Sequence, residues 1–73
     1  MTKHLDAKAR LARDLEETAT SQRAFALSVG SYQSIISRVL SGRIQPSLKL
    51  AVSIEKATEG RVPASSWVEE VAK

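Results

Sequence analysis

Apolar residues recur along this chain at intervals of three and four, the spacing of a helix, and not at every second position as in a strand. Leu11, Leu15 and Ala19 follow one another in steps of four and predict a first helix over about residues 5–18. Opposite charges in this segment also stand four residues apart, which puts the partners on one face of a helix. Three such pairs are expected on its outer face: Asp6–Arg10, Arg10–Asp14 and Arg13–Glu17.

Capping residues divide the middle of the chain into two short helices. Ser21 is a favourable N-cap for a helix over residues 22–29, and Ser31 for one over residues 32–40. Gly42 is placed to end the second of these helices as its left-handed C-terminal residue. The connection between the two helices is only a tight turn.

The next helix has equally clear ends. Ser47 is a favourable N-cap for a helix over residues 48–58, and Gly60 is expected to close it. The pattern as a whole predicts an all-α fold, a compact bundle of four to five helices. At 73 residues the chain is expected to form one domain over residues 1–73.

The C-terminal segment adds a last short helix, because Ser66 and Glu69 have the spacing of a capping box. Trp67 follows directly and is expected in the core or in a dimer contact. Arg61, just before this segment, is interpreted as a surface charge near a helix end.

Residues 22–39 carry the spacing of a helix-turn-helix, with its core at about residues 21–41. Two helices joined by a tight turn can cross closely only where the first is small, and Ala26 is placed at that point. The turn needs a residue that accepts a positive φ, which Gly30 does without steric cost. Ile36 and Val39 can then pack back onto the first helix. The second helix of such a unit enters the DNA major groove.

The net charge of the chain is a mild +3, and the positions of the charged residues are more informative than this total. Residues 18–54 contain no Asp or Glu, and the acidic residues all lie on either side. The same segment holds four cations, a local charge of +4: Arg23, Arg38, Arg43 and Lys49. A moderately basic segment that coincides with the helix-turn-helix is the electrostatic footprint expected of a surface that faces phosphate.

Several classes of function fit the composition poorly. The chain has no cysteine and a single histidine, so we expect neither a disulfide, nor a metal site, nor a cofactor. It lacks a nucleophile with a positioned base and a glycine-rich phosphate loop, so we do not expect an enzyme. No stretch approaches the ~20 apolar residues of a membrane span, and charged residues interrupt the apolar run that a signal peptide would need at the N-terminus. The expected location is the cytoplasm of a bacterial host, on DNA.

Two segments resemble a known family. Residues 21–42, SQRAFALSVGSYQSIISRVLSG, resemble the helix-turn-helix of the lambda-repressor and Cro superfamily, the XRE-type regulators. Residues 45–60, QPSLKLAVSIEKATEG, resemble the fourth helix of small phage Cro-like regulators and of YdaS-type antitoxins. The resemblance covers about residues 20–63. It implies a lambda-repressor-like bundle of four to five helices that binds operator DNA, usually as a homodimer.

Sequence readout is expected from the outward residues at the start of the second helix of the unit, which meet base edges first. Gln33 aligns with the superfamily's glutamine at this point, and its amide can pair with adenine. Tyr32 can contact a base or sugar, or rest on its own helix. Arg38 can reach either a guanine or a phosphate. The base-contacting set is Tyr32, Gln33, Ser34, Ser37 and Arg38.

Phosphate contacts are expected around this helix, where they position the protein without carrying sequence information. Gln22 aligns with the superfamily residue that touches phosphate. The predicted set is Gln22, Arg23, Ser31, Arg43 and Lys49. Binding that relies on such contacts should weaken steeply with salt.

The function predicted from these features is a phage-type repressor that occupies a promoter operator as a homodimer. A two-fold dimer would place its half-sites about one helical turn apart, ~34–36 Å. The rival hypothesis is an antitoxin or anti-repressor that acts mainly by binding another protein. Such a protein should show an exposed apolar patch, for which Ile35, Ile44 and Val68 are candidates. Non-specific nucleoid binding fits poorly with a net charge of only +3.

Overall fold

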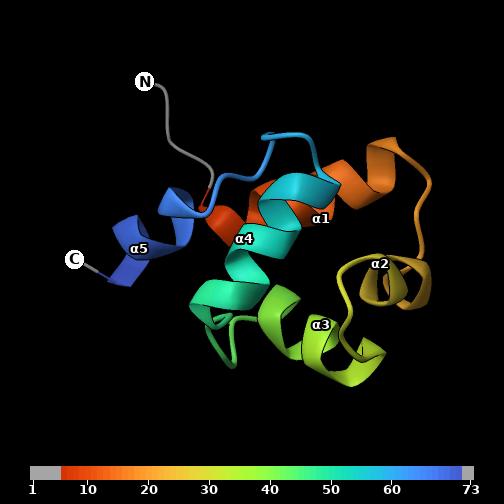
Figure 1. The fold of residues 1–73 in the computed structure, drawn as a ribbon, viewed down its shortest axis with the longest axis horizontal. Helices are drawn as coiled ribbons and strands as arrows, with labels where there is room; N and C mark the ends of the chain where they lie inside the picture. The colour runs from red at the N-terminus through yellow and green to blue at the C-terminus, as the bar shows by residue number, and fades with distance from the viewer. Residues whose placement is uncertain (1–5, 72–73) are drawn as a thin grey trace.

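Helix-forming segments separated by capping residues produce a fold made of helices alone in the part of the chain that the structure describes. The structure is a computed structural model that describes residues 6–71, with side chains described for residues 6–68. Its elements are α1 (Ala7–Glu17), α2 (Gln22–Ser28), α3 (Gln33–Leu40), α4 (Leu48–Ala57) and α5 (Ser65–Val71) (Figure 1). The predicted all-α bundle is therefore confirmed. Its Cα radius of gyration is 11.3 Å, the value of about 11 Å expected for a compact chain of this length.

Side-chain caps begin three of the helices. Asp6 caps α1 by accepting from the Ala9 N–H at 2.9 Å. The predicted caps Ser21 and Ser47 are confirmed, since their hydroxyls accept from N–H groups in the first turns of α2 and α4. Each such cap stabilises a helix by about 1 kcal/mol. The predicted start of the first helix at residue 5 lies outside the described residues.

The predicted cap of α3 is wrong, because Ser31 serves the end of α2 instead. The Ser31 N–H donates to the carbonyl of Ala26 at 2.8 Å, and the Gly30 N–H donates to that of Leu27. With Gly30 at a φ of 69°, this is the Schellman closure of a helix C-terminus. Helix α3 therefore starts one residue later than predicted, after Tyr32, which makes no side-chain capping bond.

Helices α1 and α4 also end in a Schellman closure, but there the left-handed residue is not a glycine and could not be recognised from the sequence. Ala19 adopts a φ of 54° after α1, and it is exposed rather than part of the apolar face that was predicted. Glu59 adopts a φ of 55° after α4, one residue before Gly60, which was expected to close that helix. Left-handed backbone at residues with a Cβ is strained, so both positions carry a local cost.

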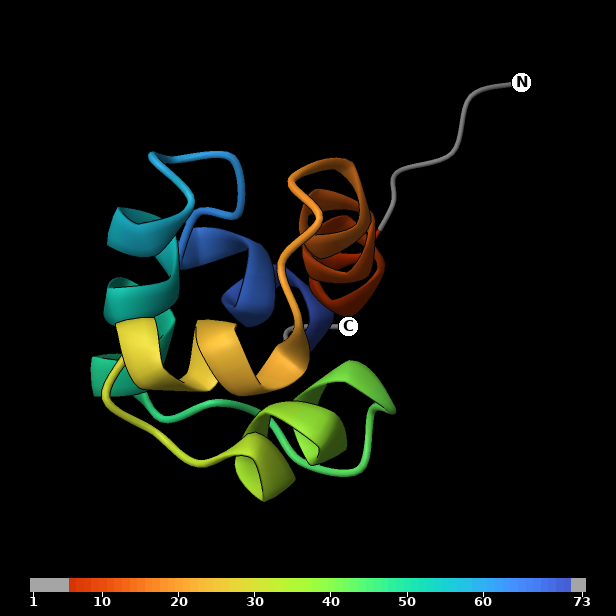
Figure 2. The ribbon, with the colours of Figure 1, turned by 90° about the vertical axis from the view of Figure 1, so that its right-hand side faces the viewer.

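Helices α2 and α3 pack on each other along one side of the molecule, with α3 at the lower edge in both views (Figures 1 and 2). Ala26 of α2 is 2% exposed, and Ile36 and Val39 of α3 are buried in the same core cluster. The predicted inward residues of α3 are thus confirmed, and the small Ala26 is buried in the cluster that contains them. Leu11 of α1 and Ile54 of α4 complete the centre of the core.

The charges of α1 pair differently from the prediction. Asp14 was expected on the outer face, but it is 7% exposed and accepts from Arg61 Nε at 2.5 Å. This bond raises the pKa of the Arg61 guanidinium above its ordinary value. Among the residues that the structure describes, the remaining ion pairs are Asp6–Lys8 and Arg61–Glu59. Arg61 therefore links the segment after α4 to α1 through its ion pair with Asp14, and it is not simply a solvated charge.

The C-terminal segment packs as predicted but starts differently. Helix α5 begins at Ser65, so Ser66 lies inside its first turn and its hydroxyl donates to the Pro63 carbonyl. Ser66 is therefore not the N-cap that was predicted, and the Glu69 side chain lies outside the described residues. Trp67 is buried in the core, as one of the two predicted placements requires.

Candidate nucleic-acid interface

Helix α3 divides cleanly into a buried and an exposed side. Ile36 and Val39 are buried, and Ile35 is half-buried against the core. The helical period turns the remaining polar residues away from that side. All five side chains of the predicted base-contacting set are exposed: Tyr32, Gln33, Ser34, Ser37 and Arg38. The structure thus brings this set together on one accessible surface.

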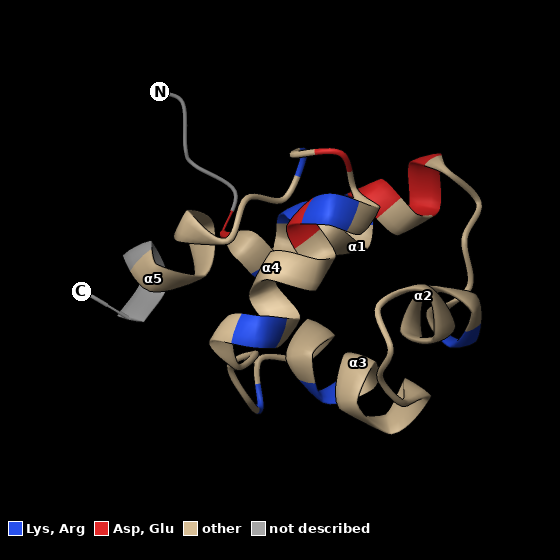
Figure 3. Ribbon diagram, in the orientation of Figure 1, with Lys and Arg blue, Asp and Glu red and all other residues tan. Residues whose placement is uncertain are grey.

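This surface belongs to a larger one without acidic residues. We call the exposed surface of α2, α3, the loop over residues 41–47 and the start of α4 the basic face. Figure 3 shows blue alone on these elements, whereas the red positions lie on α1 and around the end of α4. Its four cations are all exposed: Arg23, Arg38, Arg43 and Lys49. The other two residues of the predicted phosphate set, Gln22 and Ser31, are half-buried.

The end of α3 determines where Arg43 lies. The Arg43 N–H donates to the carbonyl of Arg38 at 2.9 Å, and the Gly42 N–H donates to that of Val39 at 3.1 Å. Gly42 has a φ of 82°, so the prediction that it ends the helix as a left-handed residue is confirmed. This Schellman closure turns the chain back and brings residue 43 beside the turn of α3 that carries residue 38.

As a consequence, two arginines share one open hollow. Its cavity volume is about 340 Å³, and we call it the serine–arginine hollow. Its lining consists of Ser34, Ser37, Arg38, Ser41 and Arg43. Sequence reasoning missed Ser41, although its position four residues after Ser37 and seven after Ser34 places it on the same helical stripe.

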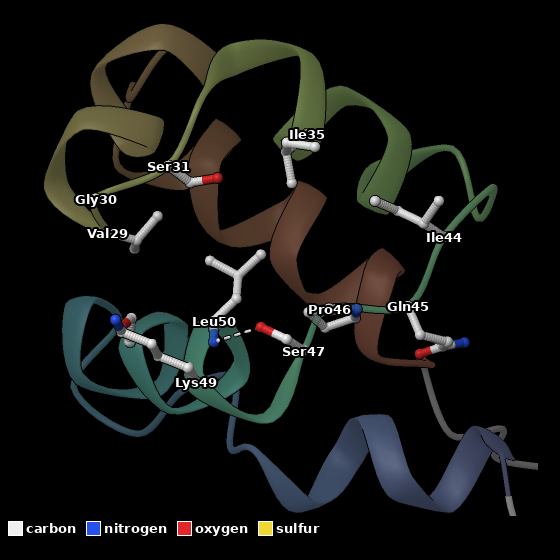
Figure 4. Close-up of a pocket in the computed structure, with 11 residues that line it drawn as sticks. Val29, Gly30, Ser31, Ile35, Ile44, Gln45, Pro46, Ser47, Lys49 and Leu50 are labelled. Atoms are coloured by element: carbon white, nitrogen blue, oxygen red, sulfur yellow. Dashed lines mark hydrogen bonds between the residues drawn. The ribbon is translucent and has the colours of Figure 1, made fainter.

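A second concavity lies between the α2–α3 turn and the start of α4 (Figure 4). Its volume is about 340 Å³, and its apolar wall includes the half-buried side chains of Ile35, Ile44 and Leu50. Ser31 borders it from the turn and Lys49 from α4. The two predicted phosphate-contacting residues at this end of the basic face are therefore separated by an apolar groove.

The exposed apolar residues differ from the predicted ones. Ile35 and Ile44 pack partly against the core and do not form a free patch. Val68 is exposed as predicted. Sequence reasoning missed Leu27 on α2 and Leu48 at the start of α4, which are 74% and 76% exposed. These two residues are the largest aliphatic side chains left without cover in the described part of the chain.

Other kinds of observation add little about function. In the described residues, no three His, Cys, Asp or Glu side chains are grouped so that they could hold a metal ion. No helix within residues 6–71 has the length and apolar character needed to cross a bilayer. Comparison with models of protein families, with curated proteins and with solved structures found no match to this chain. A functional proposal therefore has to rest on the α2–α3 unit and the basic face.

Proposed function

We propose that this protein is a sequence-specific regulator of transcription that binds double-stranded DNA with α3 in the major groove. The observation that carries the proposal is the exposed polar side of α3 at the centre of a face whose charged residues are all cationic. The DNA major groove is about 12 Å wide and admits one helix. Helix α3 offers it an outer surface of glutamine and serine, while Ile36 and Val39 hold its inner side on α2.

Base readout in this proposal centres on the first turn of α3. The exposed Gln33 amide both donates and accepts, so it can pair with the N6 and N7 edge of adenine. Tyr32 precedes it and is 76% exposed, so its ring can lie against a base or sugar. Ser34 and Ser37 are short and exposed, so they allow a close approach of the helix to the DNA.

Phosphate contacts would come from the cations around α3. Arg23 lies on α2, Arg43 in the loop after α3 and Lys49 on α4, and all three are exposed. These elements flank α3, so the cations can reach the backbones on both sides of the groove. Contacts of this kind fix position and orientation and are lost steeply as salt rises.

We further propose that the protein acts as a homodimeric repressor in the cytoplasm of a bacterial host. Two copies related by a two-fold axis would read an inverted repeat with half-sites ~34–36 Å apart. Occupancy of a promoter is the simplest mode of action, because a domain of this size offers little further surface for recruiting polymerase. The resemblance to small phage Cro-like regulators points in the same direction.

One observation favours a protein partner as the alternative. Leu27 and Leu48 are 74% and 76% exposed, and exposed apolar side chains can supply part of a protein contact. An antitoxin or anti-repressor would use them to bind its target. Such a role does not require the carboxylate-free face over residues 18–54, so DNA binding explains more of the molecule.

Selection of a random duplex library on the purified protein at two salt concentrations tests the proposal. Enrichment of an inverted repeat with a fixed half-site spacing is the expected result. Recovery of unselected DNA at low salt alone would refute sequence-specific binding and favour the protein-partner alternative.

A variant pair then locates the reading surface. Gln33→Ala should abolish the preference for the selected duplex and keep the salt-sensitive background binding, because phosphate contacts carry no sequence information. Lys56→Ala removes an exposed cation of α4 outside the basic face and should change neither property. Affinities for the selected duplex and a scrambled one, measured by fluorescence anisotropy, give the comparison. Unchanged specificity in Gln33→Ala would show that α3 is not the reading helix.

A further inference from the structure

Two guanidinium groups border the serine–arginine hollow without any compensating anion. Arg38 and Arg43 are exposed, and neither side chain makes a hydrogen bond or ion pair with another residue in the described part of the chain. No carboxylate lines the hollow. Like charges beside one open hollow repel each other only weakly in water, and an anion between them would turn this repulsion into attraction.

The backbone holds the two arginines in this arrangement. The Arg38 carbonyl accepts the N–H groups of Arg43 and Ile44 at 2.9 and 3.4 Å, and the Ser41 hydroxyl at 3.1 Å. The Lys8 side chain lies beside this turn, with Cε 3.2 Å from the point where a Cβ on Gly42 would be. The proximity of the arginines is therefore a property of the fold and not of side-chain rotamers alone.

We infer that the serine–arginine hollow binds one backbone phosphate of the DNA, so that Arg38 is a phosphate ligand and not a reader of guanine. This inference rests on the proposed DNA-binding function. Guanidinium groups only donate hydrogen bonds, and the hydroxyls of Ser34 and Ser37 can donate as well, whereas the Ser41 hydroxyl already donates to the Arg38 carbonyl. A phosphate offers only acceptors and a negative charge, which matches these donors.

A guanine edge matches the hollow less well. Guanine presents two acceptors in the major groove, but the cytosine paired with it presents an amino donor beside them. Arg38 also lies in the second turn of α3, whereas base contacts come first from the N-terminal residues of a recognition helix. Sequence readout then depends on the side chains outside the hollow, the Gln33 amide and the Tyr32 ring.

The test compares Arg38→Ala, Arg43→Ala and the double variant, with Lys56→Ala as the control of equal charge change for each single variant. Binding to the selected duplex and to a scrambled duplex is measured by fluorescence anisotropy over a range of salt. A shared phosphate predicts that the ratio of the two affinities stays within about threefold in every variant. It also predicts that the double variant flattens the slope of log K against log salt by about one unit and not by two.

Two results with DNA would overturn the inference. A larger loss of the affinity ratio in Arg38→Ala would identify this residue as a base reader, since one bidentate base contact is worth about five- to 150-fold in discrimination. A slope change of about two units in the double variant would mean that the arginines bind separate phosphates.

Titration with inorganic phosphate keeps the test independent of DNA binding. In ¹H–¹⁵N NMR spectra at constant ionic strength, phosphate should shift the signals of Ser41, Gly42 and Arg43 and of the arginine Nε–H groups. These shifts should be absent in the double variant. If the wild-type protein binds no duplex but shows the shifts, the DNA-binding proposal fails while the anion site stands. If the shifts are absent, or persist in the double variant, the anion site is wrong.

Discussion

The close crossing of α2 and α3 depends on a small residue at position 26, and replacing it should be costly. Ala26 is 2% exposed and belongs to the same core cluster as Ile36 and Val39. A leucine there adds three carbon atoms where the packing leaves no room. Inserting extra methylene groups into a packed core costs about 1–3 kcal/mol. A folded chain of 73 residues has a total stability of only about 4–11 kcal/mol.

Ala24→Leu is the matched control for Ala26→Leu. Ala24 lies two residues away on the same helix and is exposed, so both variants change helix propensity by the same small amount. Urea unfolding followed by circular dichroism should give a lower midpoint for Ala26→Leu with an unchanged m-value. In a thermal scan the loss corresponds to a fall in Tm of roughly 4–8 °C per kcal/mol. Equal midpoints for the two variants would refute the claim that the crossing requires a small residue.

Two further predictions concern the ends of α1. Ala19→Gly should stabilise the protein by about 1 kcal/mol, because a residue with a Cβ is strained at a φ of 54°; an unchanged urea midpoint would contradict this. Asp6→Asn should reduce the loss of folding stability that occurs as the solution is made acidic. The Lys8 ammonium, helped by the Ala9 N–H, lowers the pKa of Asp6 in the folded protein. The stabilisation that the ionised Asp6 carboxylate gives the folded protein is therefore present above the unfolded pKa of about 3.9. It is lost as the pH falls through the lower pKa of the folded protein. Thermal scans of wild type and variant between pH 2 and pH 6 measure this loss. The same fall in Tm with falling pH in both proteins would count against the prediction.

Local signals predicted much of the fold from the sequence. Ser21 and Ser47 cap helices because a hydroxyl satisfies N–H groups only three residues away. Gly30 and Gly42 end helices because they accept positive φ. Ile36 and Val39 were placed in the core because the helical period alone fixes which side of α3 they occupy.

The errors arose where the deciding partner is remote or where the backbone overrides residue type. Asp14 is bonded to a guanidinium 47 residues away, which no pattern within α1 can reveal. Ala19 and Glu59 take left-handed conformations that neither residue type favours. Ser31 resembles a cap in sequence, but its N–H closes the preceding helix instead.

The sequence also predicted part of the candidate site. The outward positions of Gln33, Ser34, Ser37 and Arg38 follow from the period of α3. Tyr32 precedes the helix, and all five predicted residues are exposed. Their contacts with DNA remain predictions. The juxtaposition of Arg38 and Arg43 was not foreseen, because it depends on the path of the chain after Gly42 and not on the spacing of the two residues.

The separation of charge across the molecule has a kinetic consequence. Figure 3 shows acidic and basic positions mixed on α1 and around the end of α4, whereas the basic face on the other side carries basic positions alone. The protein therefore carries an electric dipole in addition to its net charge of +3. In the field of a polyanion such a dipole rotates the protein before contact, so that a larger share of collisions occurs with α3 foremost. Salt should accordingly slow the productive encounter itself and not only shorten the life of the complex.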